Sequence, residues 1–362
     1  MWTSRTPFTA VAVAVLAVAC GGGGDGGGDV GQLSPYVLIS AANQDLVARA
    51  SLASIMPFTG VPVLAASPSP GLATKAQAVD ASTGSGHGGL TQLALRAVKL
   101  ASTQPTSTPA GMARPLMQYT DTFACVLTGT TTVTWDDKDN SVTISAGDTL
   151  SVSFNQCDDD LGWIFNGGMG MTIATYSSTP AAEDLTGSMT FQSLTMVDQS
   201  GSFSLNGSVS FHLNATLTPT GLDMLGSYSV AGSGLTVGRA GAAAGLSDTF
   251  SYRAGYTVSD RDFVSSVMGG ESWEVISASG DFGSQSLGGD LTLSTATPFR
   301  SVYTDPTGDI FPTEGQLFAT GRNDTKIGLT ATQTVQVRMD LCDDGDGLWE
   351  ASKMVDWDWL LL

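Results

Sequence analysis

A regular alternation of apolar and polar residues over Ser202–Thr218 most constrains what this 362-residue chain can fold into. Successive side chains of a β-strand point to opposite faces. A helix, which repeats every 3.6 residues, cannot separate the two sets in this way. The segment is therefore predicted to be a long strand with one dry face and one hydroxyl-rich face. Its dry face would carry Phe203, Leu205, Val209, Phe211 and Leu213.

The same alternation recurs from about residue 116 to the C-terminus. Gly167, Gly187 and Gly207 fall at equal intervals of 20 residues, which suits either one long strand and a turn or a hairpin of two shorter strands. Residues 116–362 are thus predicted to be mainly β: a long-stranded antiparallel meander forming a curled sheet, barrel-like or sandwich. Glycines at matching heights would let this sheet bend.

Residues 34–115 are predicted to form a short Ala-rich helical segment with two helices and linkers that precedes the β domain. One helix is predicted over Gln44–Met56, with Asn43 as its N-cap and Pro57 ending it. The other is predicted over Leu90–Ala101, because apolar residues line one stripe of it; these are Leu90, Leu93, Ala97 and Leu100. We interpret the segment as a spacer, and a docking or plug segment is the alternative.

The chain carries a formal net charge of −19 and has a pI of about 4.1. This charge repels phosphate backbones and argues against nucleic-acid binding. It also disfavours attachment to an anionic membrane surface by charge alone.

The N-terminus has the pattern of a secretory signal over residues 1–19. Arg5 precedes an apolar run from Phe8 to Ala19, which is too short to span a membrane. The run leads directly to Cys20, which glycines follow. This segment resembles the signal peptide of bacterial (Gram-negative) lipoproteins, in which small residues precede a Cys that becomes the acylated N-terminus.

The resemblance covers about 20 residues and implies a location. Cys20 would carry the acyl chains, which anchor stably when two or more are present. Residues 20–33 would be the lipidated Cys and its Gly-rich tether. In that class Asp after the Cys favours the inner membrane, so Gly21 implies a lipid anchor in the outer membrane. Whether the protein faces the periplasm or the cell surface stays open.

Three further cysteines are Cys125, Cys157 and Cys342. An exported chain matures in an oxidising compartment, so one disulfide is expected. We predict Cys125–Cys157, which requires a chain reversal near Gly129, and Cys157–Cys342 is the alternative.

The segment from Asp340 to Gly347 is partly similar to a calcium loop of the EF-hand type. Asp340 and Asp344 match the first and fifth loop positions, whereas Cys342 replaces an oxygen ligand. Asp346 or Glu350 could compensate for the absent acid at the end of the loop. We interpret the segment as an acidic turn, with calcium at Asp340, Asp344 and Asp346 as the alternative; no other cofactor is predicted.

The GxSxG, HExxH and GxxxxGK[ST] motifs of nucleophilic, zinc-dependent and phosphate-binding chemistry do not occur in the sequence. No catalytic residue is therefore predicted, and the chain is expected not to be an enzyme. The expected function is that of an outer-membrane-anchored lipoprotein with a scaffold or adaptor role in the cell envelope. Its partners would be the membrane, through Cys20, and an envelope protein. One alternative is a binding module that carries an apolar ligand such as a lipid, and another is a membrane-inserted barrel component.

Overall fold

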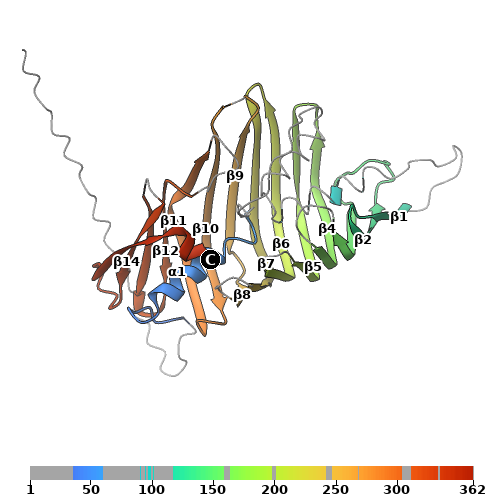
Figure 1. Ribbon diagram of the computed structural model, residues 1–362. Coiled ribbons are helices and arrows are strands. Elements are labelled where there is room, and N and C mark those ends of the chain that lie inside the picture. The colour runs from blue at the N-terminus through green and yellow to red at the C-terminus, as the bar shows by residue number, and fades with distance from the viewer. Residues whose placement is uncertain are drawn as a thin grey trace, which may run out of the picture.

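The computed structural model describes residues 36–59, 117–158, 164–197, 201–241, 247–267, 269–303, 311–332 and 335–361, and also residues 90, 94, 97, 98 and 101. Its strands belong to one 15-stranded sheet (Figure 1). In chain order the strands are β1 (Met117–Ala124), β2 (Thr128–Asp137), β3 (Thr149–Asp158), β4 (Ile164–Ser178), β5 (Ala182–Val197), β6 (Gly201–Thr218), β7 (Gly221–Gly241), β8 (Asp248–Tyr252), β9 (Thr257–Ser265), β10 (Ser272–Ser284), β11 (Gly289–Tyr303), β12 (Glu314–Thr320), β13 (Lys326–Ala331), β14 (Gln336–Cys342) and β15 (Ala351–Asp356). The helical elements are α1 (Gln44–Ala53), the 3-10 turn η1 (Arg322–Asp324) and α4 (Trp357–Leu361).

The sheet is an antiparallel meander, as predicted. From β1 at one edge to β15 at the other, consecutive strands pair with each other, except β8 and β9. β8 and β9 share a single position between β7 and β10. Strand β8 pairs with one half of β7 and β9 with the other half, so together they act as one interrupted strand.

A glycine on the next strand makes room for the backbone at the interruption between β8 and β9. Gly280 of β10 has a φ of +116°, and a Cβ added there would lie 2.6 Å from the Cα of Tyr256. Only a residue without a side chain adopts this conformation readily and allows this approach. Tyr256 nevertheless stays joined to β7, because its carbonyl accepts a hydrogen bond of 2.8 Å from the Val230 N–H.

The expected bend at matching glycines is present at two of the three positions. Gly167 on β4 and Gly207 on β6 have φ values of +95° and +117° and lie at register shifts of the sheet. Gly187 lies elsewhere, on β5 opposite Ile173 and Phe211. The reason is the chain direction, because β5 runs antiparallel to β4 and β6. A residue 20 positions further along the chain therefore lies on a strand of opposite direction and at a different height in the sheet. A residue 40 positions further along returns to the same direction and the same height.

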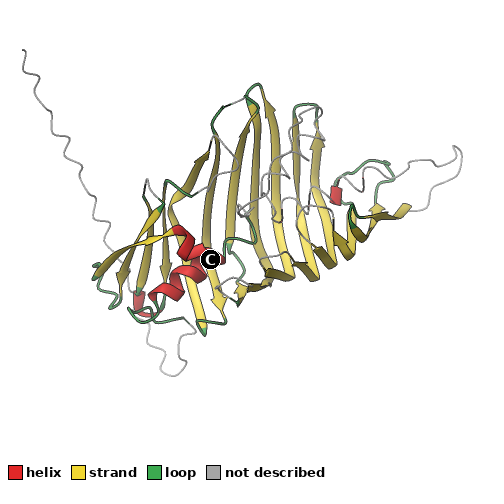
Figure 2. Ribbon diagram, in the orientation of Figure 1, coloured by secondary structure: helices red, strands yellow, loops and turns green. Residues whose placement is uncertain are grey.

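The alternation divides the sheet into two faces as the sequence predicts. Buried side chains from successive strands form one continuous core, which includes Val152, Met171, Met189, Val209 and Val237. At the C-terminal end the sheet curls, and α1 and α4 lie together against its strands (Figure 2). The chain therefore covers part of its own apolar face with its first and last helices.

Helix α1 begins at Gln44, as predicted, but it ends at Ala53, before Pro57. The side chain of Asn43 does not cap it, because its Oδ1 accepts a 2.9 Å hydrogen bond from the Ser40 N–H instead. In the second predicted helix, the described residues Leu90, Ala94, Ala97, Val98 and Ala101 are helical and buried, whereas Leu93 and Leu100 lie outside the described residues. Within the described part of the chain, no helix is long and apolar enough to cross a membrane.

Candidate functional site

The predicted lipidation site, Cys20, lies outside the described residues, as does all of the signal and tether. The predicted disulfide Cys125–Cys157 is present, with the two Cα atoms 5.5 Å apart. Cys125 follows β1 directly and Cys157 lies near the end of β3. These two strands run in the same direction on either side of β2, so both cysteines lie at the same end of the strands. The required chain reversal occurs where expected, because the Cys125 N–H donates a 3.1 Å hydrogen bond to the Gly129 carbonyl.

Removal of this disulfide is expected to lower the free energy of unfolding. The bridge closes a sequence separation of 32 residues, and loops of this size contribute about 4 kcal/mol. We expect the double variant Cys125→Ser, Cys157→Ser to lose about this amount in urea denaturation. Unmodified protein treated with reductant should match the variant, and equal midpoints with and without reductant would contradict the prediction.

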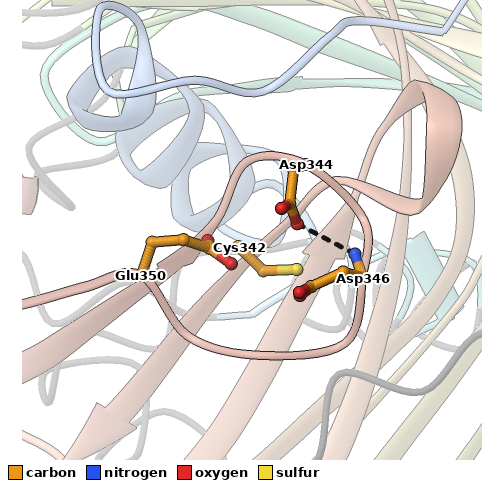
Figure 3. A group of neighbouring side chains, drawn as sticks. All are labelled: Cys342, Asp344, Asp346 and Glu350. Atoms are coloured by element: carbon orange, nitrogen blue, oxygen red, sulfur yellow. Dashed lines mark hydrogen bonds between the residues drawn. The ribbon is translucent and has the colours of Figure 1, made fainter.

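The C-terminal acidic loop follows β14 and gathers four side chains that could hold a metal ion (Figure 3). Cys342, Asp344, Asp346 and Glu350 each place one ligand atom within 4.8 Å of the others. Cys342 is a free, buried thiol, whereas the three carboxylates are exposed. Thiolates suit zinc better than calcium, which prefers oxygen ligands.

The predicted calcium set is brought together only in part. Asp344 and Asp346 lie in the loop, but Asp340 lies on β14, where its Oδ2 accepts a 2.9 Å hydrogen bond from Arg338 Nε. In the loop, Asp344 accepts a 2.9 Å hydrogen bond from the Asp346 N–H, and Asp346 accepts one of 2.8 Å from the Leu348 N–H. These bonds are those of a tight acidic turn, and calcium there stays a prediction.

A second acidic group, Asp137, Asp139 and Asp148, lies in the turn between β2 and β3. Asp148 accepts hydrogen bonds from Trp135 Nε1 at 3.1 Å and from the backbone N–H of Lys138 at 2.9 Å. Asp137 similarly accepts from backbone N–H groups within this turn. The carboxylates therefore have a structural role: they replace the strand hydrogen bonds that the turn lacks.

The third group of acidic residues is the carboxylate triad, which we define as Asp260, Asp262 and Glu274. Unlike the other two groups, all of its members are buried. Asp260 and Asp262 lie two residues apart on β9, and Glu274 on β10 pairs directly with Asp262. The three residues are only 5%, 6% and 5% exposed. One oxygen of each carboxylate lies within 4.8 Å of the others.

Burial changes the acidity of the triad. It raises the pKa of Glu274 well above its ordinary value, and the neighbouring charges of Asp260 and Asp262 raise it further. Burial, followed by the charge of Asp223, raises the pKa of Asp262 to about 7. A buried carboxylate keeps its charge only if a compensating partner is near.

The sequence contains a signal for the triad in the strand positions of its acidic residues, although these residues match no known motif. Asp260 and Asp262 share the strand parity of Val258, which is buried, and Glu274 shares that of Ala278, which is also buried. Acidic residues at positions where a strand otherwise places apolar residues indicate a buried charge. To use this signal, one must know which face of the strand each residue lies on and which strand pairs with it. The spacing of the acidic residues alone does not provide this knowledge.

The hydroxyl-rich face of β1–β5 carries a depression of about 250 Å³. Its lining includes Thr134, Ser151, Gly170, Thr172 and Thr190. Threonine pairs lie beside it, since the hydroxyls of Thr120 and Thr134 are 3.1 Å apart. This face can therefore offer hydrogen bonds to a partner.

Of the two histidines, only His212 lies within the described residues. His212 lies on β6, and its Nε2 lies within hydrogen-bond distance, 2.9 Å, of Asp184 Oδ2 on β5. The hydrogen bonds from His212 and from Asn214 lower the pKa of Asp184. His87 lies outside the described residues.

No protein-family model, curated protein or solved structure matches this chain.

Proposed function

We propose that this protein is a lipid-anchored, non-enzymatic scaffold or adaptor of the bacterial cell envelope. The anchor would be the acyl chains on Cys20, and the attached body would be the 15-stranded sheet. The Cys125–Cys157 disulfide supports an exported location, because such bonds persist in oxidising compartments.

The observation that carries the adaptor role is the unequal cover of the two sheet faces. The apolar face packs against the chain's own α1, Phe58 and Leu90. The opposite face of β1–β5 leaves Ser151, Thr172 and Thr190 exposed around the depression. We favour the adaptor over the carrier of an apolar ligand, because the chain's own side chains pack on the apolar face.

Loss of the Cys20 thiol is expected to release the protein from membranes. A Cys20→Ser variant cannot be acylated, so it should move from the membrane fraction to the soluble envelope fraction. Cys342→Ser is the matched control, because that cysteine is buried in the sheet and should not affect attachment. A Cys20→Ser protein that stays with the membranes after a high-salt wash would contradict the anchor.

The adaptor role is tested separately from the anchor. A photo-crosslinking residue at Thr190, on the hydroxyl-rich face, should join the protein to one envelope protein in intact cells. The same residue at Met354, which is 47% exposed on β15, serves as the control. Absence of a specific adduct from Thr190 would remove the basis for the adaptor. Native mass spectrometry then tests the carrier alternative, which a reproducible excess mass would favour.

A further inference from the structure

The three acids of the carboxylate triad are buried, so water can solvate their charges only poorly. Asp262 sits between two strands, opposite Met224 of β7 and Glu274 of β10. Asp260 lies opposite Gly226 and Ile276 on the same two strands. Three negative charges cannot share such a buried site unless protons or a cation neutralise them.

Glu274 supplies an independent indication that a ligand belongs in this site. Its side chain lies within the triad, and its Oε1 atom is buried without a hydrogen-bond partner. A buried polar atom left in this state destabilises the fold, and more so when it is charged. Native proteins therefore seldom keep such an atom without a ligand, an ion or a water.

The spacing of the triad fits a small cation. Calcium binds its oxygen ligands at about 2.3–2.6 Å, so two ligands on opposite sides of the ion lie about 5 Å apart. The three triad oxygens lie within 4.8 Å of one another, which is close enough for all three to contact one ion. The ligand set consists of oxygens alone, and hard cations such as Ca²⁺, Mg²⁺ or Mn²⁺ prefer such sets.

We propose that Asp260, Asp262 and Glu274 bind one divalent cation, with calcium as the preferred ion. The ion would join β9 to β10. It would neutralise the triad and satisfy Glu274 Oε1. The role is independent of the membrane anchor and of the hydroxyl-rich face.

Calcium titration of the full chain, first freed of metal with a chelator, tests this proposal. We expect isothermal titration calorimetry to detect a saturable calcium site, and we expect calcium to raise the melting temperature. Glu274→Gln should weaken calcium binding at least tenfold, as expected when a ligand oxygen loses its charge. The matched control is Glu271→Gln, because Glu271 lies close in sequence but is exposed and paired with Arg300.

The C-terminal acidic loop must be separated from the triad in this test. In a chain carrying Asp344→Asn and Asp346→Asn, the calcium site should remain, since the triad is unchanged. Loss of all binding in that chain would overturn the proposal, and so would the absence of saturable binding to the unmodified protein. These two results do not require a triad variant to fold.

Discussion

Metal-free protein is expected to lose about 4 kcal/mol of its free energy of unfolding as the pH rises from 4 to 8. The cause is Asp262, whose pKa is raised from its ordinary 3.8 to about 7 by burial and then by the charge of Asp223. Between these two values the folded protein keeps a proton that the unfolded chain releases, so stability falls as the pH rises. Each pKa unit corresponds to about 1.36 kcal/mol, which gives the total stated.

The charged groups around Asp262 support the direction of this change. Glu274 faces it from β10 and Asp260 lies beside it on β9, so its ionisation adds a charge of the same sign. On β7, the carboxylate of Asp223 is paired with Arg261 of β9 by a 2.6 Å contact. The raised pKa of Glu274 acts in the same direction as that of Asp262.

Urea denaturation at several pH values in the presence of chelator measures this effect. Asp262→Asn is the control, because it removes this titrating group and should reduce the fall in stability between pH 5 and 7, leaving the part that Glu274 contributes. Stability that rises with pH in the unmodified protein over that interval would show that the triad is not protonated when folded.

A Phe58→Ala substitution is expected to cost about 4 kcal/mol of stability. Phe58 is 1% exposed, and its ring centroid lies 5.2 Å from that of Tyr252 and 5.8 Å from that of Tyr256. Removal of a buried aromatic ring loses its transfer free energy and leaves a cavity, which together cost about 3–5 kcal/mol.

The effect of Phe58→Ala should appear as a lower urea midpoint. Leu38→Ala is the control, since Leu38 is 42% exposed and its loss should change stability by less than about 0.5 kcal/mol. A cost below about 1 kcal/mol for Phe58→Ala would mean that the N-terminal segment is not held to the sheet at this point.

The alternation of residues predicted the meander because it reports directly on which side chains are buried. The same pattern does not predict the interruption at Arg253–Tyr256, since β8 and β9 each alternate normally. That interruption depends on the contact between Tyr256 and Gly280, which lie on different strands. Helix α4 also went unpredicted, because a helix of five residues has no period to detect.

The candidate sites likewise divide into those that sequence spacing predicts and those that depend on contacts between strands. The disulfide was predictable because compartment and sequence spacing limit the pairings of three cysteines. The carboxylate triad was not predicted, because it requires the register that places Glu274 opposite Asp262. The calcium-loop pattern does not indicate that β14 places the carboxylate of Asp340 beside Arg338, because that contact depends on the strand.

The contact between α1 and α4 has a consequence for how the chain folds. Every strand pairing joins near neighbours in the sequence, so strands can add one after another as the chain is synthesised. Helix α1 is different: Arg49 stacks on Trp359 with 4.3 Å between the guanidinium carbon and the ring centroid, and Asp45 pairs with Lys353. These long-range contacts form only after the last strand has arrived. We therefore expect helix α1 to dock on the sheet only after the end of the chain has folded. Truncation just before Trp357 should leave the curled end of the sheet open to proteolysis.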